Sequence, residues 1–330
     1  MRAAMARSSG GPEVVTVEDV DEPELRPGTA RVAVHSAAVN FPDLLVLAGK
    51  YQASVLPPYT PGCEFSGRVL EIADDVASVR PGDVVFGLAT HGAFAERVVI
   101  DAGRLTPIPT AVDVDMRQLA AFGVTYTTAY HALHTFAEVR PGEHVTVLGA
   151  SGGLGLAAVD IALALGARPI AVGGSPAKLA IALERGAVAA VDYTSDDVKS
   201  RLNALTDGGA SVVIDPVGGP YAEQALRAMR WGGRYVVLGF AAGEIPRIPL
   251  NLVLLKGISV MGFENRTILD HLPDLAAAHR AEVLQLLLDG RVRPHIGSVY
   301  PLDDIVSALN QLAKRRAVGK VLVSVGDGDS

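Results

Sequence analysis

Between residues 144 and 262, short apolar segments alternate with segments of helical length, and this alternation limits the folds open to the chain. The apolar segments are 144–149, 169–172, 188–192, 211–215 and 234–239, and the helical patterns between them run to residue 165 and over 176–185, 196–205 and 221–230. Apolar strands linked by helices form right-handed βαβ units around a parallel sheet that is buried on both faces. The sequence therefore predicts a doubly wound α/β domain, closed by a further strand at 258–262.

A glycine-rich turn joins the first of these strands to the first helix. Glycine lets the backbone turn tightly and approach a pyrophosphate, and the start of a helix offers unpaired N–H groups with partial positive charge. A strand-to-helix turn without a ligand is the alternative, but so much glycine weakens a chain that has no use for it. We expect a dinucleotide at this turn, which runs from Gly149 to Gly155 and offers as contacts Ala150, Ser151, Gly152, Gly153 and Leu154.

The end of the second predicted strand bears on the choice of cofactor. An NAD-binding domain places an Asp or Glu roughly 20 residues beyond the glycine motif, where the carboxylate accepts from the ribose hydroxyls. Here the strand ends in Gly173, Gly174 and Ser175, and Lys178 opens the next helix. Without a carboxylate, nothing at this strand end repels a 2′-phosphate, and a lysine attracts it. We therefore expect NADP, with Ser175 and Lys178 as contacts; a solvated helix lysine is the alternative for Lys178.

Residues 1–110 follow a different pattern. Short β-rich segments at 14–20, 31–39, 65–72, 83–88 and 94–100 are separated by Pro-Gly pairs. Such spacing is typical of an antiparallel, partly barrelled unit. After the α/β region, 275–288 and 302–313 are predicted as helices and 320–325 as a strand. We infer that this tail returns to the first domain, so that a ligand cleft is expected between two lobes.

Charge and cysteine content exclude several classes of protein. The 29 Lys and Arg against 36 Asp and Glu give a net charge of −7. The basic residues are scattered, which argues against nucleic acid or an anionic membrane as the main partner. The single cysteine, Cys63, can form neither an internal disulfide nor a multi-thiolate zinc site. The longest apolar stretch, 145–167, is interrupted by glycines and by Asp160, and no signal-peptide pattern precedes it, so we expect a cytoplasmic protein.

Several segments, taken in order, resemble one protein family. They are 39–43 (Val-Asn-Phe-Pro-Asp) with 49–51 (Gly-Lys-Tyr), 61–64 (Pro-Gly-Cys-Glu), 80–85 (Arg-Pro-Gly-Asp-Val-Val), 123–130 (Gly-Val-Thr-Tyr-Thr-Thr-Ala-Tyr) and the glycine turn. Over nearly its whole length the chain resembles the zinc-independent quinone oxidoreductase (zeta-crystallin-like) branch of the medium-chain dehydrogenase/reductase superfamily. The resemblance implies a Rossmann NADP-binding domain at 119–263 and a β-rich, GroES-like catalytic domain at 1–118 and 264–330.

The resemblance also implies catalysis without a metal. In zinc-dependent members of the superfamily a Cys, a His and a second Cys bind the catalytic zinc, and these positions align with Asn40, Cys63 and about Ala121. One thiol without an aligned histidine cannot supply three ligands. Other histidines have no carboxylate partner in a recognisable motif and are expected to be packed or solvated, namely His131, His134 and His144.

Further cofactor contacts follow from the resemblance alone. Tyr193, after the third strand, and Arg316, before the last strand, match residues that join the lysine around the 2′-phosphate in related enzymes. Packing at a strand end is the alternative for Tyr193. For Arg316 the alternative is a solvated surface cation, whose place Arg315 could take. The family pattern assigns as further contacts Thr125, Gly239, Phe240 and Phe263.

The chemistry needs a group that stabilises negative charge on the acceptor. Hydride from a nicotinamide leaves an enolate or phenolate on an α,β-unsaturated carbonyl compound or a quinone. Asn40 and Tyr51 are the candidate catalytic residues, because an amide or a phenol can donate a hydrogen bond to this oxygen. The alternative for Asn40 is an N-cap of a helix over 40–49, and for Tyr51 an aromatic contact at the rim. Asp43 is expected to orient its neighbours.

The leading hypothesis is an NADPH-dependent reductase of quinones or other activated double bonds. An enoyl-thioester reductase is the alternative within enzymology, because enoyl reductase domains of polyketide synthases share this branch. A non-enzymatic NADPH-binding protein is the alternative from another class. The apolar strand at 258–262 is expected to form a sheet edge that pairs in a homodimer, as it does in relatives.

Overall fold

The computed structural model describes residues 1–52 and 54–326. Contacts divide the chain into two compact units, Met1–Val124 with Pro294–Ser330, and Thr125–Arg293. The sequence analysis set its domain boundaries after residues 118 and 263, so the contacts place 264–293 with the other unit. One reason is visible in the side chains, because the hydroxyl of Tyr130 donates to Glu282 at 2.7 Å within the second unit.

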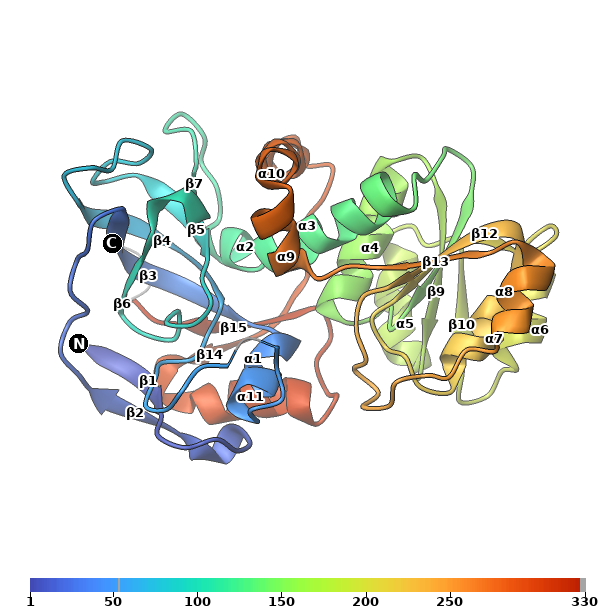
Figure 1. The fold of residues 1–330 in the computed structure, drawn as a ribbon, viewed down its shortest axis with the longest axis horizontal. Coiled ribbons are helices and arrows are strands. Elements are labelled where there is room, and N and C mark those ends of the chain that lie inside the picture. The colour runs from blue at the N-terminus through green and yellow to red at the C-terminus, as the bar shows by residue number, and fades with distance from the viewer. Residues whose placement is uncertain (53, 327–330) are drawn as a thin grey trace. The chain divides into compact units, whose positions relative to one another are not determined.

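The second unit is built on one parallel sheet (Figure 1). Its strands are β8 (His144–Leu148), β9 (Arg168–Gly173), β10 (Ala189–Asp192), β11 (Ala210–Asp215), β12 (Met229–Val237) and β13 (Ser259–Gly262). They lie in the order β10-β9-β8-β11-β12-β13, and every neighbouring pair is parallel. This order, with β8 central and the chain winding outward in both directions, confirms the predicted doubly wound domain.

Helices connect and flank these strands. They are α3 (Gly123–Tyr130) with the π-helix η3 (His131–Phe136), α4 (Gly153–Ala164), α5 (Pro176–Glu184), α6 (Val198–Leu205), α7 (Tyr221–Arg227), α8 (Leu250–Lys256), α9 (Asn265–His271) and α10 (Pro273–Leu288). Helices α4 and α5 pack on β8, β9 and β10, whereas α7 and α8 pack on β11 and β12. Two details differ from the sequence prediction: α7 ends at Arg227 rather than near residue 230, and α8 and α9 were not predicted.

The first unit holds a seven-stranded sheet in the order β14-β15-β3-β4-β5-β7, with β6 pairing β3. Its elements are β1 (Arg2–Ala6), η1 (Pro12–Val14), β2 (Val15–Asp19), β3 (Thr29–Val39), α1 (Phe41–Leu47), β4 (Glu64–Ile72), β5 (Val84–Leu88), β6 (Arg97–Asp101), η2 (Ala102–Arg104), β7 (Leu105–Pro107), α2 (Met116–Ala120), β14 (Ile296–Pro301), η4 (Leu302–Asp304), α11 (Ile305–Ala313) and β15 (Lys320–Ser324). Only the β14–β15 pair is parallel, so the predicted antiparallel, β-rich unit is confirmed.

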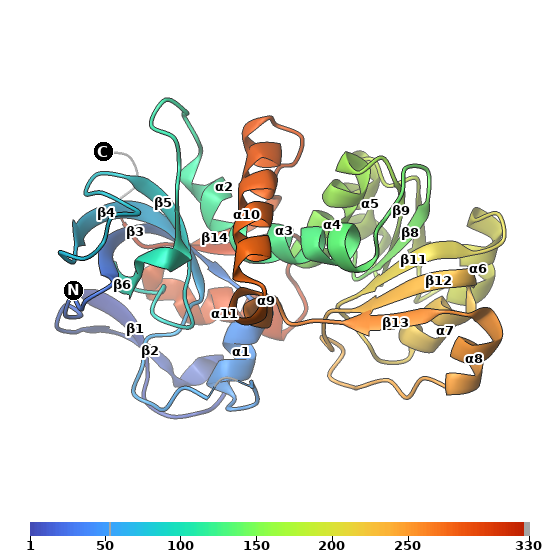
Figure 2. The same ribbon diagram turned by 45° about the horizontal axis from the view of Figure 1, so that its top comes forward.

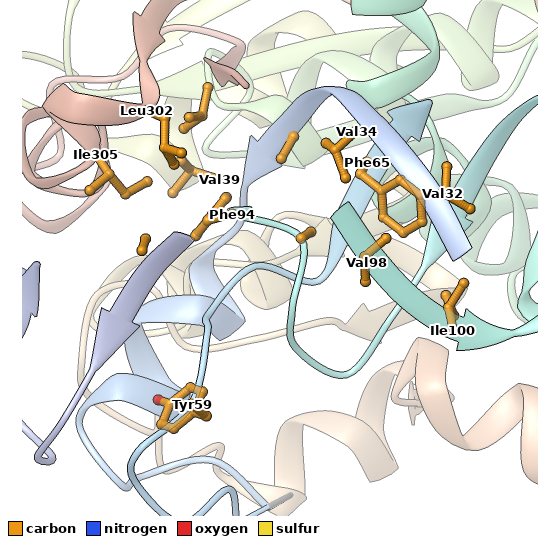
Figure 3. Close-up of a cluster of buried hydrophobic side chains, with 14 of the residues drawn as sticks. Val32, Val34, Val39, Tyr59, Phe65, Phe94, Val98, Ile100, Leu302 and Ile305 are labelled. Carbon is orange, nitrogen blue, oxygen red and sulfur yellow. The ribbon is translucent and has the colours of Figure 1, made fainter. Parts of the chain in front are cut away.

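The long strand β3 organises this unit, because it pairs with β4, β6 and β15. Val32 and Val34 from β3 point into the buried cluster shown in Figure 3, beside the ring of Phe65 from β4. Leu302 and Ile305, from the C-terminal segment, belong to the same cluster. The last part of the chain is therefore a structural part of the first unit.

Of the helices within residues 1–52 and 54–326, none has the length and apolar character needed to span a membrane.

Candidate active site

The glycine turn lies at the carboxyl end of β8, where parallel sheets of this kind bind their ligands. Gly149 has φ +65°, a backbone conformation that residues with a side chain rarely adopt. A Cβ at Gly155 would lie 2.2 Å from the carbonyl oxygen of Gly149, so no side chain fits in that position. Gly152 is the N-cap of the twelve-residue helix α4. The turn therefore presents bare backbone and unpaired helix N–H groups, the chemistry that suits a pyrophosphate.

The residues predicted to discriminate between NADP and NAD lie at the ends of the adjacent strands β9 and β10. Asp192 and Gly173 are paired in register, and the N–H of Tyr193 donates to the Gly173 carbonyl at 3.0 Å. Ser175 is the N-cap of α5, and Lys178, in the first turn, is half-buried. These neighbours come together at one corner of the sheet, because both strands end there.

Two carboxylates do lie at this corner, but neither is on β9: Asp192 is the last residue of β10, and Asp196 Oδ2 accepts from the backbone N–H of Asp192 at 3.0 Å. Asp192 Oδ1 accepts from the backbone N–H and the hydroxyl of Thr194, at 3.0 and 2.7 Å. The end of β9 itself carries only Gly173, Gly174 and Ser175. The position from which an acid would reach the ribose of NAD is thus occupied by glycine and serine.

The remaining strand ends supply further predicted contacts and one residue that the sequence reasoning missed. Gly239 and Phe240 follow β12, and Phe263 follows β13 and stacks on Phe136 with ring centroids 4.4 Å apart. At the end of β11, Asp215 accepts from the N–H groups of residues 217 and 218 at 2.8 and 2.7 Å, and from the Tyr235 hydroxyl at 2.5 Å. Asp215 therefore holds the loop beside Gly239. The available signal in the sequence was an acid that directly follows the apolar residues 212–214 of this strand.

In the first unit, Asn40 caps α1 and its amide is engaged within the protein. The backbone N–H of Asn40 donates to Asp43 Oδ2 at 2.7 Å. The side-chain Nδ2 donates to Glu64 Oε2 at 2.9 Å and to the carbonyl of Ala38 at 3.2 Å. Oδ1 accepts from Lys320 Nζ at 2.7 Å. The capping position that the sequence offered as the alternative for Asn40 is the one the structure has.

Glu64 and Lys320, which meet at Asn40, were not among the predicted site residues. Lys320 Nζ donates to Glu64 Oε2 at 2.8 Å, and the two residues are 3% and 0% exposed. Each is the first residue of its strand, Lys320 of β15 and Glu64 of β4. A buried charge needs a partner, but only the fold shows that both charges are buried and paired, so the sequence offered no signal for this contact.

The donor set around Asn40 does not fit a catalytic zinc. Burial, together with the nearby carboxylates of Asp43 and Glu64, raises the pKa of the Cys63 thiol well above its ordinary value. A protonated thiol is a poor zinc ligand. Ala121, the third aligned position, is a buried alanine, and the ammonium of Lys320 already lies against Asn40. Over residues 1–52 and 54–326, no group of three or more His, Cys, Asp or Glu side chains could hold a metal ion.

Asp43 is the titratable group of this cluster. Burial raises the pKa of its carboxyl from 3.8 to about 7, although the hydrogen bonds from the Asn40 backbone and the Cys63 thiol lower it in part. The hydroxyl of Tyr59 is buried without a hydrogen-bond partner, and burial and the nearby Asp43 charge raise its pKa. Asp43 accepts from the Asn40 backbone, and its role in orienting its neighbours stays a prediction.

Three further predicted residues are described within their own units. Tyr51 lines a small cavity of about 70 Å³ formed by Ser9 and by residues between 46 and 57. Arg316 is exposed in the segment between α11 and β15 of the first unit. Thr125, in α3, is buried at the start of the second unit.

The prediction that His131 is a packed histidine is confirmed, since it is 2% exposed and lies against His279, for which the sequence analysis made no prediction. Their Nδ1 atoms lie 2.9 Å apart, and the ring of His134 is 5.4 Å from that of His279. Burial and the two other histidines lower the pKa of His131 to about 4, so it is neutral at pH 7.

Two family models match the chain. An alcohol dehydrogenase GroES-like domain matches residues 26–110, and a zinc-binding dehydrogenase domain matches residues 153–278. These ranges fall in the first and second units respectively. They agree with the predicted pairing of a GroES-like domain with a Rossmann domain.

Similar proteins cover the whole chain. The bovine (Bos taurus) quinone oxidoreductase-like protein 2 is 40% identical over 98% of this chain and 92% of its own length. The Thermus thermophilus quinone oxidoreductase structure is 34% identical, with a TM-score of 0.83 over 98% of this chain and 100% of its own. The Escherichia coli quinone oxidoreductase, solved with NADPH, has a TM-score of 0.91 at 25% identity over 98% of this chain and 100% of its own. The chain is therefore a member of the quinone oxidoreductase family of the medium-chain dehydrogenase/reductase superfamily.

Proposed function

We propose that this protein is an NADPH-dependent reductase that transfers hydride to a quinone or another α,β-unsaturated carbonyl compound without a metal. The observation that carries the proposal is the carboxyl edge of the parallel sheet. There the turn at Gly149–Gly155 has no room for a side chain at Gly155, and β9 ends without a carboxylate. The Thermus and Escherichia coli relatives, both quinone oxidoreductases crystallised with NADPH, support the same reading.

Most of the residues that would hold the cofactor lie at the carboxyl ends of the strands of the second unit's sheet. We assign the pyrophosphate to the turn, through Ala150, Ser151, Gly152, Gly153 and Leu154. We assign the 2′-phosphate to Ser175, Lys178 and Tyr193, with Arg316 from the first unit as a further cation. Gly239, Phe240, Phe263 and Thr125 complete the set. When bound, the nicotinamide supplies the hydride.

The protein's own part in the reaction is to stabilise charge on the acceptor oxygen. We assign the hydrogen bond to that oxygen to Tyr51, whose phenol can also release a proton. Both N–H groups of the Asn40 amide already have acceptors, Glu64 and Ala38. To donate a hydrogen bond to the acceptor, the Asn40 amide would therefore have to give up its bond to Glu64 or to Ala38. The first role of Asn40 is to cap the helix that leads to Tyr51.

We further propose that a second copy of the chain covers the β13 edge. In the described part of the sheet, β13 pairs only with β12 and is the last strand (Figure 2). Leu250 and Leu254 on the neighbouring helix α8 are 78% and 80% exposed, and Trp231 and Val260 are also exposed. An unpaired edge flanked by exposed apolar side chains is usually covered by another chain.

A substrate panel tests the proposed function. NADPH oxidation is followed with 1,4-benzoquinone, 9,10-phenanthrenequinone and crotonyl-CoA, each against a reaction without protein. We expect turnover with at least one quinone. Turnover with crotonyl-CoA alone would identify an enoyl-thioester reductase instead. Tight NADPH binding with no turnover on any acceptor would favour a non-enzymatic binding role and contradict the proposal.

A further inference from the structure

The ammonium group of Lys320 lies buried between two side chains that are remote in sequence. It donates to Asn40 Oδ1 at 2.7 Å and to Glu64 Oε2 at 2.8 Å. Glu64 is 0% exposed and Lys320 is 3% exposed. A buried charge of either sign is costly unless it is paired and hydrogen-bonded, so the two residues depend on each other.

This arrangement permits only one orientation of the Asn40 amide. An amide can present its oxygen or its NH₂ group to a given neighbour, and the hydrogen bonds decide which. Lys320 can only donate, so it selects the oxygen, while the Glu64 carboxylate accepts from Nδ2 at 2.9 Å. Without the Lys320 cation the amide could turn over.

The same cluster holds the two places where the chain leaves and re-enters the first unit. Glu64 Oε1 accepts from the backbone N–H of Val124 at 2.7 Å, and Val124 is the last residue of the unit before the chain passes on. The backbone N–H of Lys320 donates to the carbonyl of His295 at 2.8 Å, one residue after the chain returns at Pro294. Lys320 and Glu64 therefore fix both connections on the side of the first unit.

Asn40 also connects the cluster to the proposed proton donor. It is the N-cap of α1, which ends at Leu47, and Tyr51 follows after three residues. The N–H of Lys50 donates to the Leu45 carbonyl at 2.8 Å, which ties the segment before Tyr51 back to the helix. A movement of Asn40 is thus passed to Tyr51 through a short helix.

We propose that Lys320 is a positioning residue for the reductase reaction, which by holding Asn40 and Glu64 fixes the start of α1, and with it Tyr51, and the connection at Val124. This inference rests on the proposed function for its effect on turnover, but its structural part does not. Lys320 acts through other residues, since its buried ammonium already has two protein acceptors.

The test compares matched variants of the full-length protein. Lys320→Met alone leaves the Glu64 charge buried without its cation and can fail to fold. The double variant Lys320→Met with Glu64→Gln removes both charges, and Lys320→Arg keeps a cation. Lys256→Met is the control for loss of a partly buried lysine, because its Nζ donates only to the backbone carbonyls of residues 227 and 229.

Turnover and NADPH affinity are measured separately. In the folded double variant we expect kcat to fall about tenfold or more, equivalent to about 1.4 kcal/mol of lost transition-state stabilisation. We expect the NADPH Kd of the double variant to stay within about twofold of that of the unmutated protein, because neither substitution changes a residue predicted to contact the cofactor. Lys320→Arg should retain more kcat than the double variant, and Lys256→Met should match the unmutated protein. A folded double variant with unchanged kcat would overturn the proposal.

Hydrogen exchange gives a readout that needs no substrate. Peptides that contain Asn40 and Val124 should exchange faster in the double variant than in the unmutated protein or in Lys256→Met. If the unmutated protein reduces no acceptor but these peptides lose protection, the reductase function fails while the positioning role of Lys320 stands. Unchanged protection in both peptides would overturn the positioning role whether or not the protein is a reductase.

Discussion

Gly174 lies directly against the ring of Tyr193. A Cβ at Gly174 would come within 2.5 Å of the ring carbon Cε2 and 2.6 Å of the hydroxyl. The Tyr193 ring in turn stacks on Tyr221, with centroids 3.9 Å apart. An acidic side chain could not be added at Gly174 without moving Tyr193. The absence of a carboxylate at this position and the placement of the tyrosine ring therefore depend on each other.

The cofactor preference follows from this corner. We predict that Lys178→Ala weakens NADPH binding by about tenfold or somewhat more, because a hydrogen bond to a charged group contributes about 1.5–3 kcal/mol and this edge is partly solvated. NADH binding should hardly change, since NADH has no 2′-phosphate. Lys199→Ala, an exposed lysine of α6, is the control. Fluorescence titration with both cofactors measures the effect. An equal loss for NADH and NADPH would assign Lys178 to the fold instead.

A buried ion pair stabilises the second unit. Arg185 Nε donates to Asp160 Oδ1 at 2.8 Å, and the Tyr126 hydroxyl donates to Oδ2 at 2.5 Å. Arg185→Met would leave the Asp160 carboxylate buried without its cation, so we predict a loss of about 3–5 kcal/mol in unfolding free energy. Arg227→Met removes the exposed pair with Glu223 and should cost about 0–1 kcal/mol. Urea unfolding at pH 7 compares them, and equal losses would contradict the prediction.

The carboxyl of Asp43 makes stability depend on pH in an unusual direction. Its folded pKa of about 7 exceeds the ordinary value of 3.8, so the folded state binds more protons than the unfolded state between these values. Its contribution is therefore complete below about pH 4 and is lost as the pH rises to 7, by at most about 1.4 kcal/mol per pH unit.

Asp43→Asn removes this contribution, because an amide does not titrate. We predict that the difference in unfolding free energy between Asp43→Asn and the unmutated protein shifts in favour of the variant as the pH rises from 4 to 7. Denaturant unfolding at several pH values measures it. A difference that stays constant across this range would show that the pKa of Asp43 is the same in the folded and unfolded states and would contradict the prediction.

From the exposed β13 edge of the second unit we predict a dimer, and we expect one charged substitution at this edge to disrupt it. Leu254→Glu places a carboxylate on the most exposed leucine of α8 and should shift the mass measured by light scattering from dimer to monomer at micromolar concentration. Leu183→Glu, on the partly exposed face of α5, is the matched control and should remain a dimer. A monomer mass for the unmutated protein would refute the dimer.

The sequence predicts the parallel sheet well because each strand has an apolar centre and the segments between the strands have helical length. The boundary between α7 and β12 was misplaced because the sheet is irregular there: Met229 pairs with Ala210, and the register then shifts before Val212. Helix α8 was missed for another reason. Three of its leucines are exposed, while Leu252 and Val253 pack on the core, so its apolar residues do not form the single stripe of an amphipathic helix.

The parts of the candidate site that depend on local backbone geometry were predictable from the sequence. The parts that depend on contacts between distant residues were less predictable. The glycine turn is recognisable in the sequence, because a side chain at position 155 would have no room and the position must be glycine. The contact between Lys320 and Glu64 joins residues 256 positions apart, and no local pattern connects them. Asn40 was recognised, but its partners come from that distant pairing, so its engaged amide could not be read from the sequence.

The central claim is that NADPH bound to this protein gives hydride to an activated carbonyl acceptor. The most direct measurement is a single turnover, in which the protein is loaded with NADPH or with NADPH deuterated at both C4 positions and mixed with 9,10-phenanthrenequinone. We predict that the nicotinamide absorbance disappears, and that the deuterated cofactor reacts more slowly because its C4 bond breaks in the step observed. Persistence of bound NADPH with this quinone and with the other acceptors of the panel would contradict the account.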